Sequence, residues 1–360
     1  KSSYAFIWIG AILGALCGSF LTILLNKYIQ SFHWGYQFLF STIFMFCAIF
    51  LFQKMIKLST ITDSNYQINN PPELESGNLV LMIRNLLKNP YLTALTIIIF
   101  SLTFSRGVFD LESDAIVERE VAFKLYKNYF WDLNQNISQD HNREQINPIL
   151  FEFIFKYKNL SDKSKNEAYK SITSKLNLSI DRISFNEKYE KFRRAIKREI
   201  TLFNSEIWTY QNSISLFFLL ICKIQFISKI GIRPLIMCLP LTYVAVFLLL
   251  FTPIGLWEIF ILKVLTLSLD YSLHNTAKEI LYVPLGTTAN LSYKPIIEGP
   301  FYKLGAASSS AYKIVLDGLL YLVSSAHFIG HIFLATAAIV AIFWAQTART
   351  LSLRFESLKS

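Results

Sequence analysis

The sequence predicts an all-α polytopic membrane protein with about eight spanning helices, and three observations support this fold class. The 360-residue chain is 53% hydrophobic, with a mean hydropathy of +0.38, whereas soluble domains average about 45–50% apolar residues. Only 17% of the residues are charged. These charges are concentrated in a few segments between long apolar runs. The composition excludes an ordinary soluble enzyme, a disordered chain and a disulfide-rich secreted module.

The spanning helices are predicted from apolar runs, since a helix needs about 20 mostly apolar residues to cross a bilayer. The candidate segments are 4–25, 35–52, 91–110, 208–227, 234–251, 254–271, 311–324 and 329–347. The run at 311–324 could begin as early as residue 306. Only Thr252 and Pro253 separate the fifth segment from the sixth. A connection this short requires the two helices to be antiparallel neighbours.

Basic residues between the spans predict the orientation, because Lys and Arg near span ends remain on the cytoplasmic side. They occur in alternate connections and at the C-terminus: Lys54, Lys57, Arg84, Lys88, Lys229, Arg233, Lys278, Lys294, Lys303, Arg349, Arg354 and Lys359. We therefore expect both chain ends on the cytoplasmic or matrix side of a bacterial or organellar inner membrane. The net charge of +10 then reflects topology, and nucleic acid is not an expected partner.

One long connection, 111–205, falls on the outer side and carries about half of the charges, with 17 basic and 14 acidic residues. Long translocated segments are exempt from the positive-inside rule, so its basic residues do not contradict the topology. Apolar residues recur at helical spacing around 149–157 and 183–192, and Glu187–Lys191 is an i,i+4 pair. The segment is predicted to be a small helical extracytoplasmic domain and a possible docking site for a protein partner.

A few charges lie within the predicted spans, where ionisable groups are expensive and therefore indicate function by default. Arg106 and Asp110 are i,i+4 on the third span, which places them on one face within pairing reach. Lys313 and Asp317 have the same spacing on the seventh, and Lys263 lies on the sixth between Glu258 and Asp270. These residues would line a polar cavity for a charged solute. Alternatively, the pairs hold helices in register, and residues near span ends reach the interface.

No metal or cofactor site is predicted from the sequence. The four Cys lie in apolar runs without Cys-x-x-Cys spacing, and they are interpreted as small buried hydrophobic residues. His327 and His331 are i,i+4 but have no nearby carboxylate or Cys in their turn, so we interpret them as interfacial. No phosphate-binding loop, nucleophile elbow or His-Glu-x-x-His motif occurs, so we expect no enzyme and no catalytic residues.

A family resemblance comes from several motifs in order. The segment 271–285 contains Tyr-Ser-Leu, Thr-Ala-Lys-Glu and Tyr-Val-Pro-Leu, and the segments 294–298 and 303–305 read Lys-Pro-Ile-Ile-Glu and Lys-Leu-Gly. These motifs resemble the ATP/ADP antiporter (TLC) family of bacterial and plastid nucleotide transporters, whose fold is similar to the major facilitator fold. The segments 89–92 and 206–209 resemble the starts of that family's seventh and eighth helices.

The resemblance implies a major-facilitator-like helix bundle whose second half is complete and whose first half is truncated in this sequence. The resemblance implies that the chain has five parts. They are two helices of the first half (1–53), a cytoplasmic linker (54–89), the six-helix second half (90–110 and 206–348), the helical insertion (111–205) and a cytoplasmic tail (349–360). The third to eighth predicted spans thus correspond to the family's last six helices.

The resemblance also implies roles for three residues. Asp110 matches an acidic position of the family's seventh helix, and Lys278 and Lys294 match lysines of its Thr-Lys-Glu and Gly-Lys-Ala motifs. Two positions depart from the family pattern, since Ala306 and Asp114 stand at or near positions that usually carry Lys. A path that carries a polyanion would lose two cations through these changes.

These observations favour a secondary carrier that exchanges or imports nucleotides, or another small anionic solute, by alternating access across a lipid bilayer. Seven residues are predicted to bind the substrate: Arg106, Asp110, Lys263, Lys313 and Asp317 within the spans, and Lys278 and Lys294 at the cytoplasmic mouth. The alternative is a transporter-derived membrane subunit without transport activity. The two missing cations favour this alternative, in which the outer insertion docks onto a larger complex.

Overall fold

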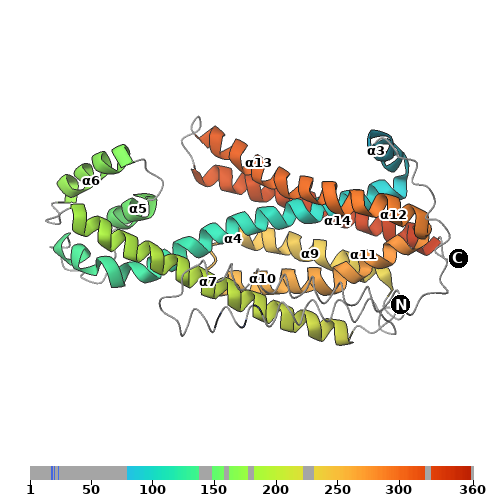
Figure 1. Ribbon diagram of the computed structural model, residues 1–360, viewed down its shortest axis with the longest axis horizontal. Helices are drawn as coiled ribbons and strands as arrows, with labels where there is room; N and C mark the ends of the chain where they lie inside the picture. The colour runs from blue at the N-terminus through green and yellow to red at the C-terminus, as the bar shows by residue number, and fades with distance from the viewer. Residues whose placement is uncertain are drawn as a thin grey trace, which may run out of the picture. The chain divides into compact units, whose positions relative to one another are not determined.

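The structure is a computed structural model that describes residues 79–137, 148–157, 162–176, 182–221, 231–320 and 326–357, together with Gly18, Phe20 and Ile23. No strand occurs in these ranges. The helices, shown in Figure 1, are α3 (Leu79–Lys88), α4 (Pro90–Ile137), α5 (Pro148–Lys156), α6 (Asp162–Leu176), α7 (Arg182–Ile221), α9 (Ile232–Leu250), α10 (Leu256–Leu269), η2 (Asp270–His274), α11 (Asn275–Tyr282), η3 (Val283–Leu285), α12 (Gly286–Ile296), η4 (Ile297–Phe301), α13 (Tyr302–Leu320) and α14 (Ala326–Ser357).

Three of the described helices are long and apolar enough to cross a membrane. These segments are Pro90–Phe130, Ile232–Leu250 and Gly330–Ser357. The predicted class of all-α membrane protein agrees with this result. The number of spans and the major-facilitator-like arrangement stay predictions. The expected spans 4–25 and 35–52 lie outside the described residues, except for the three isolated positions named above.

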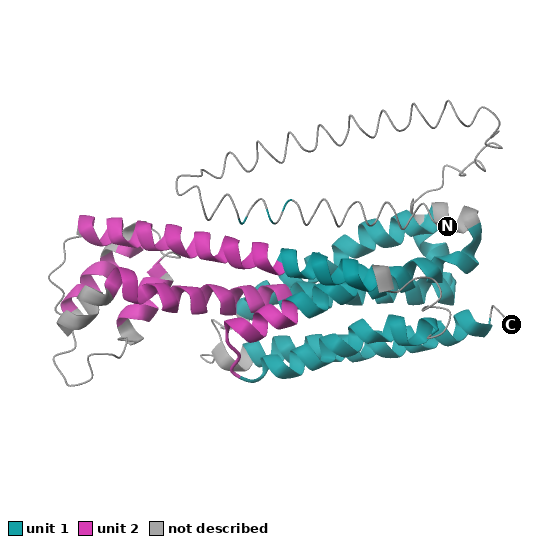
Figure 2. Cartoon of the chain, turned by 90° about the horizontal axis from the view of Figure 1, so that it is seen from below, with its two compact units in different colours: residues 1–109, 208–252, 264–360 teal, residues 110–207, 253–263 magenta. Residues whose placement is uncertain are grey.

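The chain divides into two compact units, coloured separately in Figure 2. Unit 1 comprises Lys1–Phe109, Trp208–Thr252 and Val264–Ser360, and unit 2 comprises Asp110–Ile207 and Pro253–Lys263. Unit 2 contains the whole of the predicted insertion, 111–205, and the first part of α10. Helices α4 and α7 contribute residues to both units, because neither ends where its apolar run ends.

The stretch between the predicted spans 254–271 and 311–324 is almost entirely helical. Helix α10 continues through η2 and α11 to Tyr282, and the chain turns at η3 before α12, η4 and α13. Gly286 has φ +74°, which permits the turn. Hydropathy reports only where a helix fits lipid, so it does not reveal these additional helices. Charged residues end a membrane-compatible segment without ending the helix itself.

Two glycines set the distance between α4 and α13 in unit 1. A Cβ atom at Gly305 would collide with the Thr103 side chain and would lie 2.7 Å from the carbonyl oxygen of Phe100. A Cβ atom at Gly107 would collide with the Ser309 hydroxyl. Small residues at such crossings allow helix backbones to approach closely. The Lys-Leu-Gly motif at 303–305 therefore has a packing role.

Helix α9 packs against α14 elsewhere in unit 1. Its buried residues recur every three or four positions and include Leu239, Tyr243, Val246 and Phe247. The Tyr243 ring lies 5.9 Å from that of Trp344, which is fully buried. This periodicity gives α9 one continuous apolar face toward α14.

Unit 2 has an aromatic core of its own. Phe130 of α4 lies 5.3 Å from Phe192 and 5.9 Å from Phe185, both on α7, and Tyr126 lies 5.6 Å from Phe151 on α5, measured between ring centres. All five side chains are at least 95% buried. Aromatic pairs of this kind each add about 0.5–1.5 kcal/mol beyond their buried area. The aromatic residues of this segment therefore form a packed helical core.

Candidate functional site

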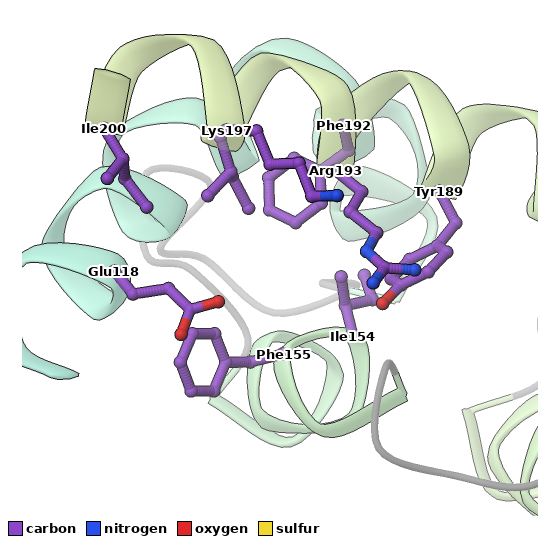
Figure 3. Close-up of a pocket in the computed structure, with 9 residues that line it drawn as sticks. Glu118, Ile154, Phe155, Tyr189, Phe192, Arg193, Lys197 and Ile200 are labelled. Atoms are coloured by element: carbon purple, nitrogen blue, oxygen red, sulfur yellow. The ribbon is translucent and has the colours of Figure 1, made fainter. Parts of the chain in front are cut away.

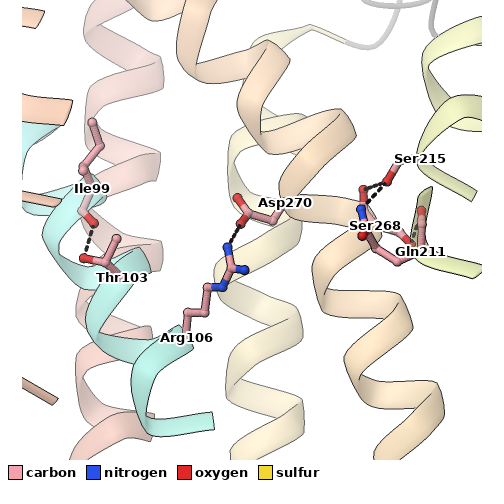
Figure 4. Close-up of polar contacts among 7 residues, drawn as sticks. All are labelled: Ile99, Thr103, Arg106, Gln211, Ser215, Ser268 and Asp270. Carbon is pink, nitrogen blue, oxygen red and sulfur yellow. Dashed lines mark hydrogen bonds and ion pairs between the residues drawn. The ribbon is translucent and has the colours of Figure 1, made fainter. Parts of the chain in front are cut away.

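A partly buried ion pair joins two helices of unit 1 (Figure 4). Nη1 of Arg106, on α4, donates to Oδ2 of Asp270, the first residue of η2, over 3.2 Å. The two side chains are only 20% and 14% exposed. The guanidinium carbon also lies 5.6 Å from the centre of the Tyr271 ring. Charges at such low exposure interact more strongly than charges at a surface.

The π-helical turn η2 determines where Asp270 lies. The turn contains Asp270, Tyr271 and His274, and it continues without interruption from α10 into α11. Ser272 within the turn donates its hydroxyl to the carbonyl oxygen of Ser268. A π turn inserts one extra residue into a helix, and such turns are frequent at functional sites.

A polar layer lies beside the ion pair and joins α7 to α10 (Figure 4). Ser268 Oγ donates to the carbonyl oxygen of Gln211 at 3.3 Å, and Ser215 Oγ donates to the carbonyl oxygen of Ser268 at 3.4 Å. The Gln211 amide in turn donates to Ser215 Oγ at 3.3 Å. All three residues are fully buried. Side-chain hydrogen bonds between helices hold membrane helices together where apolar packing alone is not specific.

Two further ion pairs connect the helices on either side of the η3 turn. Nζ of Lys278, on α11, lies 3.0 Å from Oε1 of Glu298, on η4. Nζ of Lys294, on α12, lies 2.6 Å from Oε2 of Glu279 on α11 and 5.2 Å from the centre of the Tyr282 ring. The Lys278 and Glu298 side chains are 17% and 29% exposed. The two lysines predicted at the mouth therefore lie in one region, each with a carboxylate partner.

The family comparison supports the resemblance seen in the motifs. The sequence model of the TLC ATP/ADP transporter family matches residues 195–355. The stretch 195–355 is similar to this family and is called the TLC domain below. Neither the curated proteins nor the solved structures give a match to the chain. The family is described as one of ATP/ADP transporters.

The TLC domain contains most of the residues in the three ion pairs. Asp270, both lysines and both glutamates fall within it, whereas Arg106 and Asp110 precede it on α4. Arg106 was predicted within pairing reach of Asp110, and the structure gives it a carboxylate partner on another helix. Asp110 itself belongs to unit 2, and its role stays a prediction.

Lys313 and Asp317 form no ion pair with each other in the described part of the TLC domain, and their role as substrate contacts stays a prediction. Nζ of Lys313 lies 4.9 Å from the centre of the Phe333 ring on α14, which is a cation–π distance. Asp317 is exposed and forms no ion pair within the described ranges. The i,i+4 spacing failed as a guide because Lys313 extends toward the neighbouring helix.

Lys263 belongs to unit 2 and is paired there with Asp114. Its Nζ lies 2.5 Å from Oδ1 of Asp114, and the two side chains are 8% and 64% exposed. In the sequence, Asp114 stands near a position that usually carries Lys in the family, which we interpreted as the loss of a cation. The structure shows that it also neutralises a cation, because it is the carboxylate that accompanies the nearly buried Lys263.

Sequence reasoning gave no role to His274, which lies fully buried in the TLC domain. Its ring is perpendicular to that of Trp344, at 5.5 Å, and neither ring nitrogen has a hydrogen-bond partner among the residues that the structure describes.

The carboxylates Asp270, Glu279 and Glu298 were visible in the sequence, but their partners were not. No cluster of metal-ligating side chains occurs within the described ranges.

Unit 2 contains a small cavity of about 200 Å³ on the inner side of α7 (Figure 3). Its lining combines apolar residues such as Ile154 and Phe155 with the charged Glu118, Arg193 and Lys197. Tyr189 also lines the cavity, and burial raises its pKa to about 12. The cavity is too small for a nucleotide, because ligand pockets for drug-sized molecules measure about 300–1,000 Å³.

Proposed function

We propose that the protein is a secondary carrier of nucleotides or another small anionic solute, working by alternating access. The observation that carries this proposal is the Arg106–Asp270 pair, a cation of low exposure on α4 held by a carboxylate of the TLC domain. Intramembrane ion pairs of this kind mark substrate and ion pathways. The family match supplies the substrate class, and the pair supplies a place where an anion can be bound.

Arg106 is proposed to exchange its carboxylate partner for a phosphate group of the substrate. A guanidinium binds phosphate through paired, charge-assisted hydrogen bonds, which are stronger than bonds between neutral groups. In the empty carrier Asp270 compensates the charge, since removing one partner of a buried pair costs about 3–5 kcal/mol. The exchange of partners would therefore leave no uncompensated charge during the transport cycle.

The aromatic residues beside Arg106 are proposed to receive the base or the ribose. The Tyr271 ring lies 5.6 Å from the guanidinium carbon and 6.2 Å from the ring of Trp208 on α7. Aromatic rings stack on nucleobases without selecting one base, with about 1–3 kcal/mol per base. This arrangement would place the phosphates at Arg106 and the base near Tyr271.

The two Lys–Glu pairs at the η3 turn are proposed to form a gate at the cytoplasmic mouth. Each pair links α11 to α12 or η4, and both have partial exposure. An incoming polyanion would attract Lys278 and Lys294 and release their glutamates. The lysines would then guide the substrate inward, in agreement with their match to family motifs.

A second function, that of a subunit without transport activity, is supported by the pairing of the lysines with carboxylates and by one missing lysine. Each of Lys263, Lys278 and Lys294 already has a carboxylate partner, and Ala306 stands where the family usually has Lys. In that case the three ion pairs would be structural, and unit 2 would serve as the docking part for a larger complex.

Exchange measurements distinguish the two functions. The full-length protein would be reconstituted into vesicles loaded with unlabelled ADP, and uptake of labelled ATP, ADP and other nucleotides would be followed. A carrier should show saturable uptake that Arg106→Gln abolishes and that the matched surface variant Lys303→Gln leaves unchanged. If the folded protein exchanges no anionic solute tested, the subunit function replaces the carrier function.

A further inference from the structure

A second candidate binding site lies in unit 1 where α4 begins and α14 ends. A groove of about 470 Å³ is lined by residues from the end of α3, the first turns of α4 and the last turns of α14. Lys88, the last residue of α3, and Arg354, in the last turn of α14, both line it. Both residues are exposed, and neither forms an ion pair within the described ranges. The groove thus combines two cations without carboxylate partners.

Much of the wall of the groove is apolar, although threonines and Gln346 also line it. Ile97 and Phe343 contribute hydrocarbon directly. Thr93 donates its hydroxyl to the carbonyl oxygens of Leu86 and Leu87, at 3.2 and 3.1 Å. The hydroxyls of Thr347 and Thr350 donate to carbonyl oxygens within α14, at 2.9 and 3.0 Å. Because these hydroxyls are already used, the threonines offer mainly their methyl groups to a ligand.

The helix that precedes the groove has the character of a membrane-surface helix. α3 reads Leu-Val-Leu-Met-Ile-Arg-Asn-Leu-Leu-Lys, and its Leu86 is fully buried, whereas Leu81 and Leu87 are 49% and 55% exposed. An amphipathic helix with basic residues and exposed leucines lies in the interface plane of a bilayer. The candidate spans Pro90–Phe130 and Gly330–Ser357 respectively start and finish beside this helix. We therefore expect the groove to lie at the boundary between hydrocarbon and water.

We propose that this groove binds one anionic phospholipid. The phosphate of the headgroup would lie between Lys88 and Arg354, and one acyl chain would lie along the wall formed by Ile97 and Phe343. Basic pockets between membrane helices bind anionic headgroups, with about 1 kcal/mol for each cation near the surface. A free phosphate or a nucleotide would use the cations but would leave the apolar wall uncovered. For this reason the lipid fits the groove better than a soluble anion.

Native mass spectrometry of the detergent-solubilised full-length protein tests this inference. Phosphatidylglycerol and phosphatidylcholine with identical acyl chains would be titrated, and the bound fractions compared. The wild type should prefer phosphatidylglycerol, and the double variant Lys88→Gln/Arg354→Gln should lose about tenfold or more of that preference. Arg349→Gln is the matched control, because Arg349 is exposed on the same helix and does not line the groove.

A second variant separates a lipid site from a simple anion site. Ala94→Trp places a large ring in the groove and should weaken binding of both lipids while both cations remain. Equal binding of the two lipids by the wild type would overturn the inference. So would an equal loss in the Arg349 variant, or displacement of bound phosphatidylglycerol by millimolar inorganic phosphate or ADP. Since the readout is lipid binding, its outcome is independent of whether nucleotide exchange is observed.

Discussion

The guanidinium of Arg106 and the carboxylate of Asp270 lie 3.2 Å apart although 164 positions separate them in the chain. This contact joins α4, which precedes the TLC domain, to the π turn inside that domain.

If the pair is the substrate site, Arg106→Gln and Asp270→Asn should each abolish nucleotide exchange. The charge-reversed double variant Arg106→Asp/Asp270→Arg should regain the fold but not transport, since the cation would then project from η2. Initial uptake rates and thermal unfolding of each variant check this prediction, and unaltered uptake by Asp270→Asn would contradict it.

The close crossing of α4 and α13 predicts opposite effects of two glycine substitutions. Gly305→Ala should destabilise unit 1 by about 1–3 kcal/mol, because its Cβ would meet the backbone of α4. Gly318→Ala, on the same helix, should be neutral or stabilising by up to about 1 kcal/mol, because no atom lies within 4 Å of its Cβ. Thermal unfolding in detergent measures the change in stability of both variants. Equal changes in melting temperature would contradict the close approach of α4 and α13.

The Lys263–Asp114 pair predicts an asymmetric response. Asp114→Asn leaves a nearly buried ammonium without its carboxylate and should destabilise unit 2 by about 1–3 kcal/mol. Lys263→Met replaces the cation with apolar atoms of similar length and should be close to neutral. Hydrogen exchange of peptides from unit 2 compares the two. Normal exchange of nucleotides by Lys263→Met would remove Lys263 from the predicted substrate contacts.

Tyr189 makes the stability of unit 2 sensitive to alkaline pH. Burial raises its pKa in the folded state to about 12, above the ordinary value of 10.0. The neutral phenol therefore contributes stability that is fully present below pH 10 and is lost as the pH rises toward 12. Tyr189→Phe should reduce this alkaline loss, whereas the exposed Tyr210→Phe serves as control. Hydrogen-exchange protection of α7 between pH 8 and 12 provides the readout.

The sequence was sufficient for the class of all-α membrane protein and for the resemblance to the TLC family, because both depend on composition and on local motifs. The motifs around Lys278 and Lys294 lie within the matched domain, and the apolar runs at 91–110 and 234–251 correspond to helices α4 and α9. Helix bounds were less predictable. Hydropathy marks where a segment tolerates lipid, and it does not register the charged helices that continue α4, α7 and α10.

The partners of the charged residues could not be predicted from spacing. An i,i+4 rule considers one helix alone, and it proposed Asp317 as the partner of Lys313. In the structure Lys313 instead meets the Phe333 ring of the neighbouring helix, and the cation Arg106 meets Asp270. Such pairings depend on which helices are adjacent and on the rotation of each helix about its axis. Neither quantity is contained in a local pattern.

The π turn at η2 has a mechanical consequence for the gate. It holds one residue more than an α-helical turn, and one residue corresponds to about 100° of rotation about the helix axis. Conversion of this turn to α-helix would exchange its i→i+5 backbone hydrogen bonds for i→i+4 bonds and rotate α11 about its axis relative to α10. Lys278 and Glu279 would swing away from their partners while Asp270 stayed in place. The π turn thus provides a point of rotation between the proposed anion site and the proposed gate.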